Sequence, residues 1–97
     1  MSTITMKNRY ESYKKIQENP YTLYAKVLAI LSDNKELSAR EIAKAIGLSS
    51  RQDIQPRLNE LRDRYGLIEE AGETRDKETW RTVTTYKLAE INKEKED

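Results

Sequence analysis

Apolar residues recur at helical spacing in three segments of the chain. The first segment covers residues 20–32, and its apolar side chains fall on one stripe: Leu23, Tyr24, Val27, Leu28, Ile30 and Leu31. Asn19 is a favourable N-cap, and Pro20 then takes the first helical position, where its missing N–H does no harm. The pattern predicts a helix over residues 20–32 that buries this stripe.

A second, shorter helix is predicted over residues 38–46, after a turn at Asp33-Asn34. Ser38 followed by Glu41 forms a capping box, and Gly47 suits the left-handed position after a helix. The apolar face is narrow and has small residues that allow close helix packing: Ala39, Ile42, Ala43 and Ile46. With the helix that follows, this segment has the pattern of a helix-turn-helix.

The third helix contains a proline, Pro56, on the side opposite its apolar residues Ile54, Leu58, Leu61 and Tyr65. A proline inside a helix costs about 3 kcal/mol, but in the first turn the N–H is unpaired in any case. We therefore predict an irregular turn at residues 50–52, a regular helix over 53–65, and an end at Gly66.

Two strands follow the helices. Residues 67–75 and 79–88 are predicted to form a hairpin, with residues 76–79 in the turn. Val83 and Leu88 have opposite alternation, which predicts a bulge or a frayed end. Before the helices, Tyr10, Tyr13 and Ile16 are spaced for a short helix with one apolar edge. We predict a partly helical N-terminal extension (1–19), one domain (20–88) and a disordered charged tail (89–97).

The composition limits the chemistry that this chain can perform. Its 97 residues include no cysteine and no histidine, and the formal net charge is +1. Thiolate metal sites, disulfides and the commonest general base are therefore absent, and we expect neither an enzyme nor a metal or cofactor. No apolar run suits a membrane span or a signal peptide, so we expect a cytoplasmic protein without membrane contact.

Three helices followed by a hairpin is the order of a winged helix-turn-helix domain, and two segments strengthen this interpretation. "LSAREIAKAIGLSS" resembles the second helix and turn of winged-helix transcriptional regulators. "PRLNELRDRYGLIEEAGETR" with "TWRTVTTYKL" resembles small winged-helix proteins of bacteriophages and prophages. Their third helix often carries a Pro-Arg-apolar-x-Glu-Leu stretch, matched at residues 56–61. Their wing often ends in Thr-Gly-Arg before a Tyr-Arg/Lys pair; Thr79, Arg81, Tyr86 and Lys87 match, and Trp80 stands in the glycine position.

The resemblance covers residues 20–88. It implies an α+β fold, a three-helix core plus a C-terminal β-hairpin wing, here preceded by a short N-terminal helical extension. It also implies a DNA-binding phage or prophage transcriptional regulator in a bacterial or phage-infected host cell. In this fold the third helix reads duplex DNA in the major groove and the wing contacts the backbone.

The candidate DNA-binding residues are polar or basic positions of the second helix, the third helix and the wing. They are Ser38, Arg40, Ser50, Arg51, Gln52, Gln55, Arg57, Asn59, Arg62, Arg75, Lys77 and Arg81. We predict that Arg57 and Gln52 read base edges, whereas Arg40 and Arg81 hold phosphates.

Each of these assignments has a plainer alternative. Arg57 can instead form an ion pair with Glu60 three residues on, and Ser38 can act as a cap only. The amide side chains can simply be solvated. Glu60 and Asp63 are expected to face outward and to repel phosphate. We expect Trp80 to pack on its own sheet, although an exposed tryptophan at a wing could stack or wedge.

Two other functions stay open. Residues 69–81 carry five acidic and three basic side chains, so a protein-interaction module that binds a host or phage protein complex is an alternative. A DNA replication or recombination accessory is another. The N-terminal tyrosines are expected to pack locally, with a homodimer through this helix as the alternative. Because the net charge is low, we expect DNA binding to be weak and dependent on salt.

Overall fold

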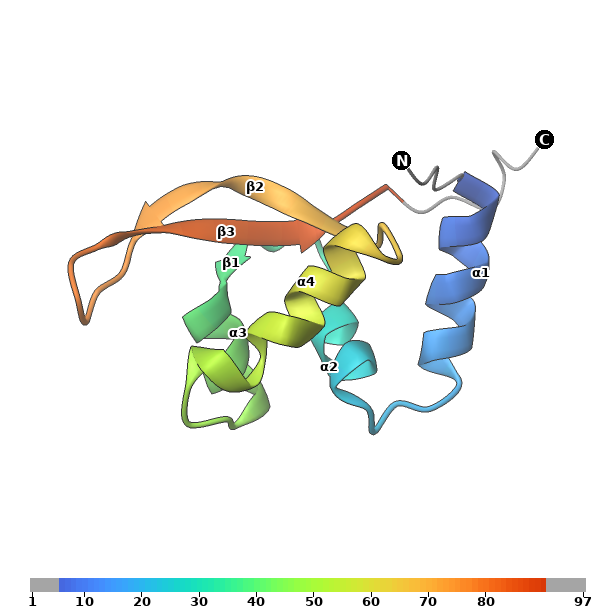
Figure 1. Ribbon diagram of the computed structural model, residues 1–97, viewed down its shortest axis with the longest axis horizontal. Helices are drawn as coiled ribbons and strands as arrows, with labels where there is room; N and C mark the ends of the chain where they lie inside the picture. Colours follow the sequence, from blue (N-terminus) through green and yellow to red (C-terminus); the bar gives the residue numbers. More distant parts are fainter. Residues whose placement is uncertain (1–5, 91–97) are drawn as a thin grey trace.

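The computed structural model describes residues 6–90 and shows an α+β chain with four α-helices and a three-stranded antiparallel sheet (Figure 1). In chain order the elements are α1 (Met6–Gln17), α2 (Leu23–Ile30), β1 (Leu37–Ser38), α3 (Ala39–Ile46), a 3-10 turn η1 (Arg51–Asp53), α4 (Gln55–Asp63), β2 (Ile68–Arg75) and β3 (Thr82–Leu88). The predicted order of helices and hairpin is confirmed, and the two-residue strand β1 is an addition. The arrangement is compatible with a winged helix-turn-helix domain.

The sheet has the order β1-β3-β2, so the last strand lies in the middle. Leu37 pairs with Tyr86 on one side of β3, and Ile68 pairs with Leu88 on the other. The sheet lies along one side of α2, α3 and α4, and the β2–β3 hairpin projects past α3, while α1 lies at the opposite end (Figure 1). This projection makes the molecule elongated, at 45 × 27 × 26 Å.

The core lies between the sheet and helices α2 to α4. Its fully buried side chains come from the three predicted helical stripes and from the residues that lead into the hairpin: Val27, Leu28, Leu31, Ile42, Ile54, Leu58, Leu61, Leu67 and Ile68. Ile30 and Tyr65 are only half-buried, at the edges of their stripes. The three helical faces predicted from spacing are therefore confirmed as core-forming surfaces.

The start of α2 differs from the prediction. The helix begins at Leu23, and its N-cap is Thr22, whose hydroxyl accepts the N–H of Ala25 at 3.1 Å. Asn19 instead accepts the N–H of Tyr21 with its side chain, in a tight turn before the helix. The prediction that Asn19 caps the helix and that Pro20 opens it is wrong, because Thr22 caps the helix directly before the apolar stripe begins at Leu23.

Pro56 lies in the first turn of α4, as predicted. The 3-10 turn η1 comes first and is capped by Ser50, whose hydroxyl accepts the N–H of Gln52 at 3.1 Å. The regular helix then starts at Gln55, two residues later than expected. The proline therefore removes no helical hydrogen bond and stiffens the start of the helix.

The predicted irregularity in the hairpin exists, but it lies in β2. Glu70 pairs with Tyr86 and Gly72 with the adjacent Thr85, so Ala71 is an extra residue in β2. A bulge in either strand changes which residues face each other across the ladder. The alternation of β3 alone therefore could not show which strand carries the extra residue.

Helix α1 packs on the rest of the chain through Tyr13 and Ile16, which contact the core. The local-packing prediction therefore holds for Tyr13, and also for Tyr24 of α2, but it is wrong for Tyr21, which is 84% exposed in the α1–α2 connection. A homodimer through α1 stays a prediction. The predicted disordered tail (89–97) starts too early, because Ala89 is buried and its N–H donates to the carbonyl of Leu67 at 2.9 Å. Residues 91–97 of that tail, and residues 1–5 of the N-terminal extension, lie outside the described residues.

Candidate nucleic-acid interface

A groove of about 560 Å³ lies between the hairpin and the segment formed by α3, η1 and α4. Arg40 at the start of α3, Arg51 in η1 and Gln55 at the start of α4 line one side of this groove. Arg81 and Thr84 line the hairpin side. Ser38 lines the groove as well, so the groove brings together five of the predicted DNA-binding residues, and these come from three separate parts of the sequence.

Arg51 and Gln52 occupy the turn η1 and are exposed. The turn holds its shape because Ser50 caps it and because Ile54, the next residue after η1, is fully buried. Ser50 therefore has a structural role in presenting its two neighbours. Arg51 and Gln52 remain available for an external partner, since no side-chain hydrogen bond or ion pair engages them within residues 6–90.

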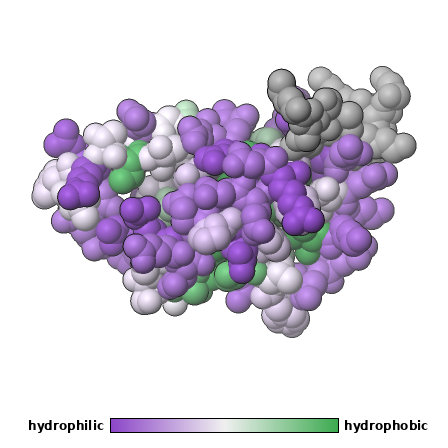
Figure 2. Space-filling model, in the orientation of Figure 1, coloured by the Kyte–Doolittle hydropathy of each residue, from purple (hydrophilic) through white to green (hydrophobic). Residues whose placement is uncertain are grey.

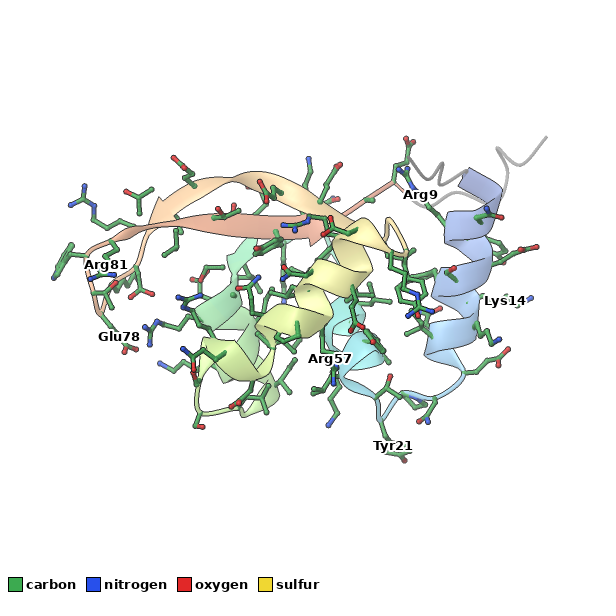
Figure 3. All side chains as sticks on the ribbon, in the orientation of Figure 1. Arg9, Lys14, Tyr21, Arg57, Glu78 and Arg81 are labelled. Carbon is green, nitrogen blue, oxygen red and sulfur yellow. The ribbon has the colours of Figure 1, made fainter. Side chains whose placement is uncertain are left out.

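The hairpin carries three further exposed cations: Arg75, Lys77 and Arg81. In the part of the chain that the structure describes, no acidic side chain lies within ion-pair distance of any of them. Figure 3 shows Arg81 at the far end of the hairpin, with Glu78 on the same turn. A second groove, of about 480 Å³, has Arg75 and Lys77 on its hairpin side and Lys44 of α3 on the other.

Arg40 has a different role from these free cations. Its Nε donates to Asp76 Oδ2 at 2.7 Å, and its Nη1 donates to Glu78 Oε1 at 3.3 Å. The Asp76 side chain is only 6% exposed. Two acidic groups therefore compensate the charge of Arg40, which ties the hairpin to α3.

Asp76 organises the hairpin turn. Its carboxylate accepts the N–H groups of Glu78 and Thr79 at 2.7 and 3.1 Å in addition to the bond from Arg40. Three donors hold the pKa of Asp76 below its usual range: first the backbone N–H of Glu78, then the backbone N–H of Thr79 and the guanidinium of Arg40. Burial acts in the opposite direction and raises this pKa. The Arg40–Asp76 pair joins residues 36 positions apart, and nothing in the local sequence signals it.

Arg57 lies on the α2 side of α4 (Figure 3). Its Nη1 is 3.4 Å from Glu60 Oε1, and its guanidinium lies 5.8 Å from the ring centre of Tyr24. Tyr24 donates its hydroxyl to the same Glu60 oxygen at 2.6 Å, and this bond raises the pKa of Tyr24. The ion pair that the sequence allowed as an alternative is therefore present. Glu60 faces Tyr24 as well as solvent, so the expectation that it simply points outward is wrong.

Arg62 is also engaged within the chain. It donates to both carboxylate oxygens of Asp63, at 2.8 and 3.0 Å, and to Glu70 of β2 at 2.9 Å. These bonds raise the pKa of Arg62 and lower that of Asp63. Arg62 therefore ties the end of α4 to β2 and carries little free positive charge.

The amide side chains of α4 form a short chain of hydrogen bonds. Gln55 donates to Asn59 Oδ1 at 3.1 Å, and the same nitrogen lies 3.2 Å from the hydroxyl of Tyr86. Asn59 itself is exposed. Gln55 is held against the sheet at the floor of the groove, whereas Gln52 is free to rotate.

Ser38 is 3% exposed and caps α3 with a complete capping box. A side chain this buried, with its hydroxyl already accepting the N–H of Glu41, is poorly placed to reach a ligand. The structure therefore favours the capping role for Ser38.

Trp80 does not pack on the sheet, so that prediction is wrong. The residue is 69% exposed and has a left-handed backbone with φ of 61°. The resemblance had placed a glycine at this position, and a glycine would adopt such a φ without strain. The ring stays exposed although the turn itself is tied to α3 by the bonds of Arg40 to Asp76 and Glu78.

The described residues show no sign of a metal centre or of a membrane helix. Within residues 6–90, no cluster of three or more Asp or Glu side chains is arranged to hold a metal ion. None of the helices in this range is both long and apolar enough to cross a membrane.

Comparisons with protein families, with curated proteins and with solved structures gave no match.

Proposed function

We propose that this protein binds duplex DNA as a winged helix-turn-helix protein, with the η1–α4 segment in the major groove and the β2–β3 hairpin against the backbone. Support comes from the order of the elements: α3, a turn closed by Gly47, η1 with α4, and then the hairpin. A role as a phage or prophage transcriptional regulator, or as a replication accessory, is a further proposal that only the sequence resemblance supports.

One observation carries the proposal. Arg51 and Arg81 line the same groove from opposite sides, and neither has an acidic partner in residues 6–90. By contrast, the three arginines with ion pairs, Arg40, Arg57 and Arg62, hold the fold together. This groove is thus lined by two arginines whose charge no acidic group within residues 6–90 neutralises, beside the paired Arg40, and unpaired positive charge of this kind suits a polyanion.

The structure changes which residues we expect to read sequence. Arg57 is engaged by Glu60 and Tyr24, so a base contact would have to break that arrangement. Arg51 and Gln52 precede α4, at the end that enters the major groove in this fold, and both are free. We therefore propose Arg51 and Gln52 as the base-reading pair, with Arg81, Arg75 and Lys77 as phosphate contacts.

The test is fluorescence anisotropy of a labelled random-sequence duplex, measured at several salt concentrations. R81A should weaken binding and flatten the log–log salt slope by about one unit, as loss of a phosphate contact does, whereas R51A should weaken binding with a smaller change in slope, as loss of a base contact does. K14A is the matched control, because Lys14 is an exposed cation on α1 at the opposite end of the molecule (Figure 3). It removes the same charge and should leave the slope unchanged.

Two results would count against DNA binding by this surface. One is equal weakening by K14A and R51A, which would indicate a general charge effect. The other is an absence of binding by the wild type at low salt, even at about 0.1 mM protein, the weak end of ordinary non-specific affinity. Circular dichroism of each variant shows whether the fold is kept.

A protein-interaction module is the second candidate, favoured by the formal net charge of only +1. The face of the molecule in Figure 2 argues against it, because hydrophobic residues there form small separate spots on a mostly hydrophilic surface. Protein-binding sites more often show one continuous apolar patch. This candidate becomes the leading one if the anisotropy experiment shows no binding.

A further inference from the structure

Trp80 is the most unusual surface residue of the molecule. Within residues 6–90, only Tyr21 and Trp80 are large hydrophobic side chains in the exposed class, and Trp80 lies in the loop at the end of a projecting hairpin. Its backbone has a φ of 61°, a conformation that a bulky side chain rarely adopts. An exposed indole in a strained position contributes nothing visible to the fold, which directs attention to an external partner.

The turn around Trp80 is well ordered by hydrogen bonds. The Trp80 N–H donates to the carbonyl of Asp76 at 2.8 Å, and the Asp76 N–H donates to the carbonyl of Arg81 at 2.8 Å. The Arg81 N–H lies 3.3 Å from the hydroxyl of Thr79. Because the Asp76 side chain also bonds to Arg40, the whole turn is anchored to α3. The indole is therefore presented from a braced loop, which lowers the entropy lost when it binds.

The charges beside Trp80 favour a polyanion. Lys77 and Arg81 have no acidic partner in the described chain, whereas the acidic groups of this turn, Asp76 and Glu78, are both bonded to Arg40. An aromatic ring between unpaired cations matches the combination by which proteins contact both the bases and the phosphates of nucleic acid.

We propose that Trp80 is a wedge that inserts at a base step of duplex DNA from the minor groove, while Lys77 and Arg81 hold the flanking phosphates. This inference rests on the proposed function and adds a specific mode of contact. Apolar side chains that enter the minor groove unstack a base step and kink the duplex. The structure favours a duplex over a single strand, because proteins that bind single strands stack successive bases on several aromatic rings, and here one ring is presented alone.

The chain contains a single tryptophan, so its intrinsic fluorescence reports on this residue alone. The experiment excites the full-length protein beyond the tyrosine absorption band and adds random-sequence duplex, single-stranded DNA of the same length, or heparin. Heparin supplies dense negative charge without bases. At equal bound fractions, measured in parallel by sedimentation, we expect strong quenching by duplex and little change with heparin.

Two variants separate the contribution of the Trp80 ring to DNA binding from the effect of its left-handed backbone conformation. W80N removes the indole and keeps a residue that tolerates a left-handed backbone, so the turn should persist. We expect W80N to bind duplex at least about fivefold more weakly by anisotropy, whereas W80F should keep most of the affinity. Y21A is the matched control, because Tyr21 is 84% exposed in the α1–α2 connection, away from the hairpin (Figure 3), and its loss should have no effect.

The outcomes distinguish this inference from the proposed function. If duplex binds but leaves the fluorescence unchanged, or if W80N binds as tightly as the wild type, the wedge is refuted and DNA binding stands. Stronger quenching by the single strand at equal occupancy would also refute a duplex wedge. If no DNA binds at all, both proposals fall, and Trp80 becomes the first residue to test for contact with a protein partner.

Discussion

Replacing Ser38 by alanine removes the hydroxyl that caps α3 and leaves half of the capping box. The hydroxyl accepts the N–H of Glu41 at 3.2 Å, and the Ser38 N–H donates to Glu41 Oε1 at 2.9 Å. Loss of a serine cap typically costs about 1 kcal/mol, with a range of about 0.5–2. Ser38 is only 3% exposed, so water replaces the lost acceptor poorly. We therefore expect S38A to lower the free energy of unfolding by about 1–2 kcal/mol.

The assay is urea unfolding followed by far-ultraviolet circular dichroism. Fluorescence is unsuitable because Trp80 is already exposed in the folded protein. S38A should lower the midpoint and leave the slope unchanged, as expected when stability alone changes. The control is S49A, because Ser49 is exposed and makes no side-chain hydrogen bond within residues 6–90; its effect should stay within about 0.5 kcal/mol.

A double-mutant cycle with E41A tests the reciprocal bond. Each substitution removes a different bond, because the Ser38 hydroxyl accepts the backbone N–H of Glu41 and the Glu41 carboxylate accepts the backbone N–H of Ser38. Both bonds hold the same turn, so loss of one weakens the other, and the double variant should lose less stability than the sum of the single variants. A loss below about 0.3 kcal/mol for S38A would refute the capping argument, since even the weakest caps contribute about 0.5. Weaker DNA binding by S38A at unchanged stability would instead show that Ser38 is a ligand contact.

Three further predictions concern single contacts. The Arg57–Glu60 pair is about 40% exposed, so R57A should lower the free energy of unfolding, measured in urea, by at most about 1 kcal/mol. R57A should also leave the salt slope of DNA binding unchanged. A flatter slope would show that Arg57 contacts DNA after all. The pKa of Asp76 is lower in the folded state than in the unfolded state. Its carboxylate therefore stabilises the fold at pH values above the ordinary aspartate pKa, and this stabilisation disappears as the pH falls through the lower pKa of the folded state. Melting temperatures of wild type and D76N should therefore converge in acid, and a gap that persists there would contradict the assignment. Gly47 has a φ of 100° and open space where a Cβ would lie, so G47A should cost about 1–2 kcal/mol by urea unfolding, from backbone strain alone; a much larger loss would mean that the side chain meets a neighbour.

Signals that act within a few residues were readable from the sequence. The capping box of Ser38 and Glu41, the left-handed Gly47 and the first-turn position of Pro56 all appear in the structure as predicted. Each depends on the backbone geometry of one turn of helix, which is the same in every protein. The buried stripes were equally clear, because side chains three or four residues apart share one helical face.

Local signals fail where two of them compete. The prediction took Asn19 as the cap because Pro20 follows it, and it overlooked Thr22, which is also a favourable cap residue. The structure uses Thr22, and Asn19 closes the preceding turn instead. Tyr13 and Ile16 pack α1 on the core, and this contact lies outside the few residues from which a capping signal is read.

Only the tertiary structure decided which charged residues are free. Arg40 meets Asp76, and Tyr24 meets Glu60, each across 36 residues of sequence, whereas Arg51 and Arg81 meet no acidic group in residues 6–90. The tertiary structure also decided the exposure of Trp80, because Trp80 lies in the turn of a hairpin that extends past α3 (Figure 1). Helical spacing and caps fix the faces of each element through local backbone geometry. The partners of a long charged or aromatic side chain depend instead on the packing of distant elements, which a pattern of neighbouring residues does not contain.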